Sequence, residues 1–533
     1  MQEIFADPTP VRGLPASEFI EIRNRSAMPV NLRNWTLRAG NNTGRILVSF
    51  SLLPDSMAIL CSSASAPSYQ PLGTTIVVSS FPSLNNEGDT LALADAAGKV
   101  VHGLSWDKSW YGNSLREEGG WSLEMKDLRF PCAGAINWTA SNDPKGGTPG
   151  KANNTRSLIS PSIPQIRHGY LTGNHLFLQF DAPVNPVNAS ITGIPDLQPT
   201  QQQEIPPLFN ALLVPVGRTP DTTSLYTFRI TGLRSCEGTL LPDTLLPTGL
   251  LQWPKPGELI ISELLFNPPP GGSDFIELFN NSNRVLDAGT AHLANRSADG
   301  RIANVSRISP FPIPLLPGRY LALTPDTSWL RQRFRPPDSA RLLTALLPSF
   351  PDDKGHALLL NSQGSVLDEL PYLENWHAPL ISNKEGISLE RLTPQRGSHL
   401  SDNWYSAAGT AGFGTPGYRN SQHLTPKERS RNFTLSAKII TPDQDGRDDF
   451  LLLDYQFPAP GSIIRVRIFD ETGRQVNSIA NNVLGGRSGH FRWDGTNEKG
   501  MIVRTGFYVL LAEAFHPDGQ VSRFREAVAL YKK

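Results

Sequence analysis

Four aspartates crowd one short stretch near the C-terminal end of the chain, the segment DQDGRDD at 443–449. They are Asp443, Asp445, Asp448 and Asp449. Carboxylate oxygens packed into a short loop suit calcium, and Gly446 permits a sharp turn between them. No glutamate follows at the position where an EF-hand has its bidentate ligand. The segment is therefore a candidate calcium site of another kind, and calcium is the one cofactor that the chain suggests. The alternative is a solvated turn that opens a strand, in which Asp448 or Asp449 caps backbone amides.

Two pairs of acidic residues have the three-residue spacing that invites comparison with catalytic carboxylates. They are Glu18 with Glu21, and Asp274 with Glu277. In a strand, residues three apart point to opposite faces, so neither pair can act together as a glycosidase pair. We interpret all four as structural polar positions at strand edges.

Aromatic residues gather in the segment SWDKSWYGNSLREEGGW at 105–121. Trp106, Trp110, Tyr111 and Trp121 could form an exposed platform that stacks on sugar rings. They could also belong to a loop folded over one end of a domain with its rings buried. Because aromatic rings dominate core burial, we favour the buried loop.

Motifs of the common catalytic sites are missing from the chain. The ten histidines are scattered, with no HxH or HExxH spacing, and there is no GxSxG segment and no P-loop. Distant residues could still meet in space, but the domains inferred below use nearly the whole length. We therefore predict that the protein is not an enzyme.

Charge and hydropathy narrow the classes of partner. Lys+Arg and Asp+Glu both number 49, so the net charge is zero. This balance lacks the basic footprint of a nucleic-acid binder. No apolar stretch approaches the length of a membrane span, and the opening MQEIF has no features of a signal peptide. We expect a mature segment given a new methionine, or a fragment of a longer chain.

The three cysteines are Cys61, Cys132 and Cys236. They are too few for a disulfide framework, and no spacing among them suits zinc. Cys61 and Cys132 fall in one proposed domain. They are expected either to form a disulfide with each other or to stay as two buried free thiols.

A repeated phrase reveals how the chain is organised. GTPG stands at 147–150 and again at 414–417, and other blocks recur in the same order before it. The matched blocks include EIFADP at 3–8 with ELLFNP at 263–268, EFIEIRN at 18–24 with DFIELFN at 274–280, GWSLE at 120–124 with GISLE at 386–390, and the Asn-Trp pairs at 137–138 and 403–404. We infer an internal duplication. The short alternating runs between turn residues predict β-sandwiches.

This order of blocks resembles the lamin-tail domain, over residues 1–154 and 256–422. The resemblance implies an immunoglobulin-like sandwich of a type common in secreted bacterial proteins. The second copy departs from the first where Ile387 replaces Trp121. It also has Thr324 at about the position of Cys61.

Two other segments complete the chain. Residues 155–255 resemble a bacterial immunoglobulin-like spacer, and TPKERSRNF at 425–433 reads as a charged linker. Residues 434–533 carry PDQDGRDD, IFDETGR, WDGTNEKG and GFY. They resemble the C-terminal immunoglobulin-like domain of secreted Bacteroidetes-type proteins. That resemblance implies a sorting or anchoring module of type IX secretion.

The sequence thus predicts an all-β protein of four tandem immunoglobulin-like β-sandwiches. Their predicted bounds are 1–154, 155–255, 256–422 and 434–533. We expect a non-catalytic scaffold or adhesion protein, extracellular or on the outer cell surface, acting as a monomer. Its partner would be a protein or polysaccharide at the cell surface, not nucleic acid, with no membrane span. The alternative is the accessory region of a larger secreted hydrolase or nuclease whose catalytic domain lies upstream.

Overall fold

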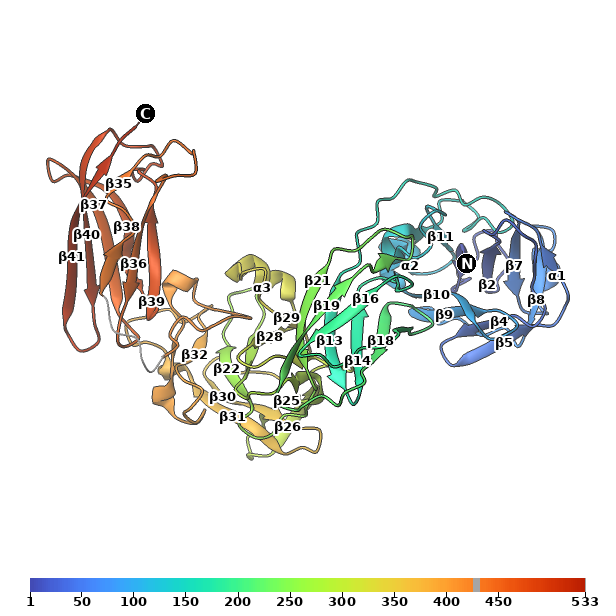
Figure 1. Ribbon diagram of the computed structural model, residues 1–533, viewed down its shortest axis with the longest axis horizontal. Coiled ribbons are helices and arrows are strands. Elements are labelled where there is room, and N and C mark those ends of the chain that lie inside the picture. Colours follow the sequence, from blue (N-terminus) through green and yellow to red (C-terminus); the bar gives the residue numbers. More distant parts are fainter. Residues whose placement is uncertain (425–431, 533) are drawn as a thin grey trace. The chain divides into compact units, whose positions relative to one another are not determined.

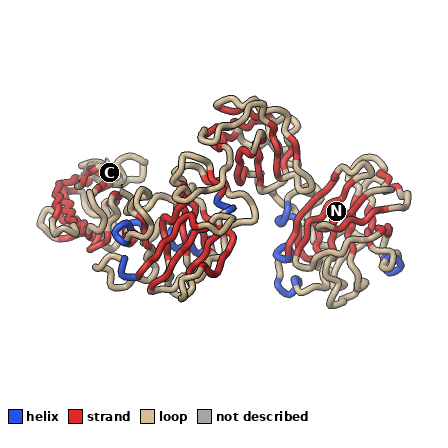
Figure 2. Tube along the Cα trace, turned by 90° about the horizontal axis from the view of Figure 1, so that it is seen from below, coloured by secondary structure: helices blue, strands red, loops and turns tan. Residues whose placement is uncertain are grey.

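The computed structural model describes residues 1–424 and 432–532, and strands dominate it throughout (Figures 1 and 2). The described helices are short. The predicted all-β class is confirmed. The chain forms two compact units, residues 1–250 and 251–533. Most of the predicted linker, 425–431, lies outside the described residues.

The first repeat, residues 1–154, is a sandwich made from one long curled sheet. Its strands are β1 (Glu3–Phe5), β2 (Phe19–Arg23), β3 (Val30–Asn31), β4 (Thr36–Ala39), β5 (Asn42–Ile46), β6 (Ser51–Leu52), β7 (Met57–Cys61), β8 (Thr75–Ser79), β9 (Gly88–Ala94), β10 (Val100–Asp107), β11 (Leu123–Met125) and β12 (Trp138–Ala140). Its helical turns are α1 (Ala66–Tyr69), η1 (Lys108–Tyr111), α2 (Ser114–Glu117) and η2 (Gly134–Asn137).

The strand order of this sheet is β10-β9-β4-β5-β8-β7-β2-β1-β11-β12, and β3 pairs separately with β6. Both halves of the sheet contribute to one core. Leu37 and Leu91 come from β4 and β9, while Ile20 and Leu60 come from β2 and β7. The alternating apolar positions seen in the sequence therefore close over a shared interior.

The spacer segment has two facing sheets, ordered β13-β14-β18-β17 and β16-β19-β21, with β15 paired to β20. The strands are β13 (Ile166–Thr172), β14 (His175–Phe180), β15 (Val184–Asn185), β16 (Ser190–Ile194), β17 (Gln203–Glu204), β18 (Ala211–Pro215), β19 (Leu225–Thr231), β20 (Arg234–Ser235) and β21 (Thr244–Gly249). Leu178 and Val214 from one sheet share a core with Phe228 and Ile230 from the other.

The second repeat, residues 256–422, again pairs two sheets, ordered β29-β28-β23-β22-β32-β33 and β26-β25-β30-β31. The strands are β22 (Leu259–Leu265), β23 (Phe275–Asn280), β24 (Leu286–Asp287), β25 (His292–Arg296), β26 (Ile302–Arg307), β27 (Pro314–Leu315), β28 (Tyr320–Thr324), β29 (Leu342–Thr344), β30 (Lys354–Leu360), β31 (Val366–Leu373), β32 (Leu389–Arg391) and β33 (Trp404–Ser406). The helical elements are η3 (Ala288–Thr290), α3 (Thr327–Phe334), η4 (Glu374–Trp376), η5 (Ser401–Asn403) and η6 (Gly409–Ala411).

The C-terminal segment packs a sheet ordered β34-β36-β39 against one ordered β35-β41-β40-β37-β38. The strands are β34 (Phe433–Leu435), β35 (Ile439–Ile440), β36 (Leu451–Gln456), β37 (Ile463–Asp470), β38 (Gln475–Leu484), β39 (Ser488–Trp493), β40 (Gly506–Phe515) and β41 (Val521–Leu530). Trp493 and Tyr508 lie in its core with their rings edge to face.

The cysteine pairing differs from both sequence expectations. Cys132 forms a disulfide with Cys236, 104 residues away, and Cys61 is a free, buried thiol. Cys61 ends β7 and packs in a small apolar cluster with Phe19 and Tyr69, so its side chain is enclosed there. The disulfide therefore joins the first repeat to the spacer instead of closing within the repeat.

Candidate functional site

Three buried glutamates lie on neighbouring strands of the first repeat. Glu3 of β1 lies directly opposite Glu21 of β2 and Glu124 of β11. All three are fully buried. Carboxylates directly opposite each other on a sheet repel when charged, so the site needs donors or protons to be stable.

The GTPG phrase supplies those donors. The amide of Thr148 donates to Glu3 Oε1 at 2.8 Å, and its hydroxyl donates to Glu124 Oε1 at 2.8 Å. The amide of Gly150 donates to Glu21 Oε2 at 2.6 Å. We name this arrangement the carboxylate clasp, because it ties the exit of the repeat to three strands.

The second repeat contains the same clasp, atom for atom at its centre. Glu263 lies opposite Glu277 and Glu390. The amide of Thr415 donates to Glu263 Oε1 at 2.9 Å, and the amide of Gly417 donates to Glu277 Oε2 at 2.7 Å. The Thr415 hydroxyl lies 3.0 Å from Glu263 Oε2 and 2.9 Å from Glu390 Oε1. One hydroxyl carries one proton, so one of these two carboxyls must be protonated for both bonds to form.

Burial also favours the protonated form of glutamate carboxyls in the clasps. Desolvation, reinforced by the neighbouring glutamates, raises the pKa of Glu3 well above its usual range. Desolvation raises the pKa of Glu21 to about 7 and that of Glu263 to about 8. The pKa of Glu277 is raised for the same reason. The clasp thus holds protons near neutral pH.

Glycine is required where the exit segment passes the clasp. Gly150 has φ +77°, and a Cβ there would lie 2.2 Å from the carbonyl oxygen of Leu72. Gly417 has φ +83°, and a Cβ there would lie 2.9 Å from the backbone of Arg341. Both the left-handed backbone and the close approach explain why the phrase keeps its last glycine.

The placement of Glu21 and Glu277 at strand edges was wrong. Each lies on an inner strand of its sheet and is wholly buried, because the clasp amides replace the water that it loses. Glu18 and Asp274 each directly precede their strand and are half-buried, and Glu18 accepts the amide of Leu84. Sequence reasoning missed the clasp. The available signal was that glutamate is identical in three of the matched blocks.

The aspartate loop is partly assembled as predicted. Carboxylate oxygens of Asp443, Asp445 and Asp449 lie within 4.8 Å of one another, and the first two residues are exposed. Asp449 also accepts the amides of Gln444 and Gly446, at 2.6 and 2.9 Å, as the turn interpretation expects. Asp448 is not in this group. Three carboxylates fit part of the ligand set of six to eight oxygens that calcium takes, so the calcium site stays a prediction.

The aromatic segment of the first repeat is mainly structural. Trp106 and Tyr111 are buried and meet edge to face at 6.3 Å, as the buried-loop interpretation predicts. Trp110 packs against Trp138. Trp121 is half-buried, with the guanidinium groups of Arg12 and Arg116 at 4.6 and 4.7 Å from its ring. Its faces are therefore occupied by the chain itself.

A serine–histidine pair does form from distant residues, but it is enclosed. His377 Nδ1 lies 2.9 Å from Ser406 Oγ, and both residues are buried. Desolvation lowers the pKa of His377 to about 4, and its Nε2 has no hydrogen-bond partner among the described residues. In the described part of the chain no carboxylate orients the ring, so the pair lacks the third member of a catalytic triad.

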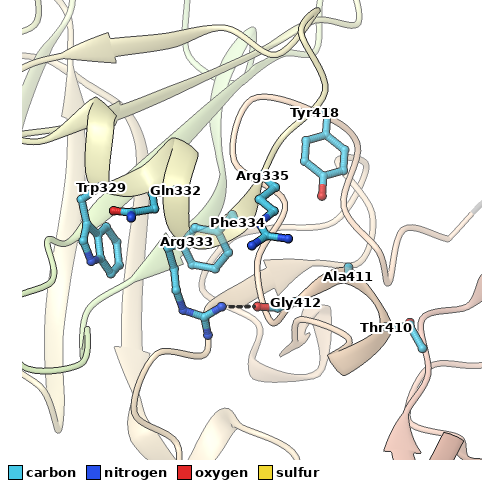
Figure 3. A pocket seen from close by; sticks show the side chains of 9 residues that line it. All are labelled: Trp329, Gln332, Arg333, Phe334, Arg335, Thr410, Ala411, Gly412 and Tyr418. Carbon is cyan, nitrogen blue, oxygen red and sulfur yellow. Dashed lines mark hydrogen bonds between the residues drawn. The ribbon is translucent and has the colours of Figure 1, made fainter. Parts of the chain in front are cut away.

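An open groove of about 710 Å³ lies on the second repeat, between α3 and the loop that carries η6 (Figure 3). Its lining residues are Trp329, Gln332, Arg333, Phe334, Arg335, Thr410, Ala411, Gly412 and Tyr418. We name it the arginine–aromatic groove. None of the lining residues is acidic.

Local sequence explains how α3 presents this groove. Asp326 caps the helix by accepting the amides of Ser328 and Trp329, each at 2.9 Å. Leu330 and Phe334 point inward and are buried. The helix ends at Arg335, whose backbone is left-handed with φ 48°. This periodicity leaves the arginines of the last turn outside the core.

Residues 1–108 match the model of the lamin tail domain. This stretch contains Glu3 and Glu21 of the first clasp. No curated protein matches the chain.

Solved structures give only distant similarity. A DUF4876 family protein from Bacteroides thetaiotaomicron is 13% identical, covering 43% of this chain and 86% of its own, with a TM-score of 0.19. Dimeric latent PorU from Porphyromonas gingivalis is 10% identical, covering 83% and 40%, with a TM-score of 0.16. PorZ, a surface component of the type-IX secretion system of P. gingivalis, is 11% identical, covering 84% and 56%, with a TM-score of 0.17. The chain thus spans 40% of PorU and 56% of PorZ. At these scores, none of them carries a function over to this chain.

Within the described part of the chain, the helices are all too short or too polar to cross a bilayer.

Proposed function

We propose that this protein is a non-catalytic scaffold of tandem immunoglobulin-like sandwiches that works outside the cytoplasm, on or near the cell surface. Residues 1–154 and 256–422 would both be lamin-tail domains, and 434–533 an anchoring domain. Its task would be adhesion or the spacing of binding loops from the surface. The observation that carries this proposal is the disulfide between Cys132 and Cys236.

The compartment follows from the chemistry of that bond. Disulfides persist in oxidising environments and are rare where thiols are kept reduced. Cys132 follows β11 in the first repeat and Cys236 follows β20 in the spacer, with Cα atoms 6.3 Å apart. A structural bond at this position favours a protein that leaves the cytoplasm.

The scaffold role follows from what the bond joins. Next to it, Gly103 of β10 meets the spacer so closely that a Cβ would lie 2.0 Å from the carbonyl oxygen of Pro207. We expect two sandwiches that touch through backbone atoms and share a covalent link to move together. Such a joint transmits force and keeps spacing, as a surface scaffold requires.

The arrangement of polar groups supports a non-catalytic protein. The carboxylates of the two clasps are buried and already accept hydrogen bonds from backbone amides and hydroxyls. The Ser406–His377 pair is enclosed as well. These groups stabilise the sandwiches and leave no reacting atom open to substrate.

The location is tested on cells. An antibody raised against the purified chain should label intact cells of the source organism, and external protease should remove the signal. Disulfide mapping of the protein from those cells should recover Cys132 linked to Cys236 and Cys61 as a thiol. Labelling that appears only after lysis, or two free thiols at 132 and 236, would contradict the proposal.

The structural role is tested with the double variant Cys132→Ser/Cys236→Ser. Closing a loop of about 100 residues is worth up to ~4 kcal/mol, so the variant should lower the melting temperature of the first unit by several degrees. Reductant should do the same to the wild type and nothing further to the variant. Cys61→Ala is the matched control and should keep the response to reductant.

A further inference from the structure

We infer that the arginine–aromatic groove of the second repeat binds an acidic polysaccharide, with its guanidinium groups on uronate carboxylates. This rests on the proposed function, because such polymers are met outside the cytoplasm. It names the ligand class and the site, which the proposed function leaves open.

The groove carries cations that the protein does not neutralise. Arg333 and Arg335 extend from the end of α3 toward the loop of Ala411 and Gly412 (Figure 3). Arg333 donates to the carbonyl oxygen of Gly412 at 3.2 Å. Among the described residues, no carboxylate lies within ion-pair distance of either guanidinium, although the whole chain has zero net charge. An anion is the partner that such a pair lacks.

The Arg333 guanidinium is also held in place for a ligand. Arg335 sits at the left-handed end of α3, and the Arg333 guanidinium lies 5.0 Å from the Phe334 ring while bonded to Gly412. Phe334 is itself fixed edge to face against Phe275 at 5.6 Å. A guanidinium presents a planar fork of donors that matches a carboxylate, so a preset fork binds with less loss of side-chain freedom.

The flanks of the groove favour a sugar over a bare anion. Trp329 and Tyr418 are half-buried and stand on either side of Arg335 in the view of Figure 3. Aromatic faces give apolar contact to a ring-shaped ligand. Gln332 adds an exposed polar side chain that can bond sugar hydroxyls. A volume of about 710 Å³ lies within the range of ligand clefts, roughly 300–1,000 Å³.

Nucleic acid fits the groove less well, although bases also stack on aromatic rings. A nucleic-acid site needs a run of cations that follows the phosphate backbone. The groove offers two arginines among its lining residues. The first repeat has no equivalent, because α1 reads APSY where α3 reads TSWLRQRF. The site therefore belongs to the second repeat alone.

The test measures binding of the full chain by isothermal titration calorimetry. The probes are polygalacturonate, the same polymer fully methyl-esterified, poly-glutamate and a single-stranded oligonucleotide. Polygalacturonate should bind, and methyl esterification, which removes the charge but keeps the sugar rings, should weaken binding at least ten-fold. Poly-glutamate, which lacks the sugar ring, should bind more weakly than polygalacturonate.

Two variants locate the binding site, one altered in the groove and one altered outside it. Arg333→Gln/Arg335→Gln should weaken polygalacturonate binding at least ten-fold. Arg331→Gln is the matched control, because Arg331 is exposed on the same helix but does not line the groove. Equal affinity for the methyl ester, stronger binding of poly-glutamate or the oligonucleotide, or an equal loss in the Arg331 variant would each overturn the inference. Failure of the proposed function would appear instead in the cell-labelling experiment, which uses no polysaccharide.

Discussion

The two repeats are alike inside and different at their surfaces. Inside, the clasp and its supports recur: the side-chain amide of Asn153 donates to the carbonyl oxygens of Gln2 and Met125, and the side-chain amide of Asn420 to those of Ser262 and Arg391. Outside, one repeat has the arginine-flanked Trp121 and the other has the arginine–aromatic groove. A buried polar network cannot lose one member without stranding the others, whereas surface loops are free to change.

The two repeats are also joined to the segments that follow them in different ways. The first is held to the spacer by a covalent bond, Cys132–Cys236. The second is held to the C-terminal segment by hydrogen bonds that start at the clasp. Ser421 contacts Glu390 through its hydroxyl and accepts the amide of Arg487 through its carbonyl at 2.9 Å. The clasp is thus common to both repeats, whereas the junction that follows it differs.

The largest expected effect comes from breaking the clasp itself. Glu124→Ala and Glu390→Ala should each lower the free energy of unfolding of their own repeat by about 3–5 kcal/mol, because several buried donors lose their acceptor. Glu124 accepts from Thr148, Asn154 and Thr155. Hydrogen-exchange mass spectrometry on the full chain separates the repeats, since their peptides are distinct.

The controls for the clasp are the exposed Glu118→Ala and Glu385→Ala, which should leave exchange in both repeats unchanged. If Glu124→Ala loosened both repeats equally, or neither, the clasp would not be a local lock. Similar losses in the two repeats would show that the shared hydrogen bonds carry the stability. A much larger loss of stability in one repeat would indicate that its junction with the next segment also contributes to stability.

The second largest effect on stability is expected from a change of pH. A carboxyl whose folded pKa is raised stabilises the protein while it is protonated, and that stability is lost as pH rises from the unfolded pKa through the folded one. For Glu21 the window runs from 4.5 to about 7, and for Glu263 from 4.5 to about 8. Protection in each repeat should therefore decrease across its window, by ~3 kcal/mol for Glu21.

The measurement is hydrogen exchange of each repeat from pH 5 to 8.5, corrected for intrinsic rates. Glu21→Gln and Glu277→Gln, which cannot ionise, should flatten the slope in their own repeats. Protection that is constant or that rises over this range would contradict the raised pKa values.

The smallest effect should come from the position where the repeats differ most visibly. Trp121→Ile gives the first repeat the residue that the second has at 387. It should cost about 1–2 kcal/mol, because the stacking of two guanidinium groups on the ring is lost. Urea unfolding followed by exchange in the peptide containing residue 121 measures it. Trp121→Phe keeps an aromatic face and should lose less; an isoleucine variant as stable as the wild type would show that the stacking contributes nothing.

The local sequence was enough to predict the all-β class and the duplication. Short alternating runs between glycine and proline turns have the period of strands, and that period is a property of neighbouring residues. The matched blocks also contained Glu3, Glu263 and the GTPG phrases. They indicated that these positions matter, but not what they do.

Only the tertiary structure decided the clasp, the cysteine pairing and the groove. Thr148 meets Glu3 across 145 residues, and Cys132 meets Cys236 across 104. Arg333 contacts Gly412 across 79. Such pairs depend on strand order and register, which local patterns leave open. From sequence alone, a glutamate in a strand is expected at the surface. Here the fold supplies the backbone amides that make its burial possible.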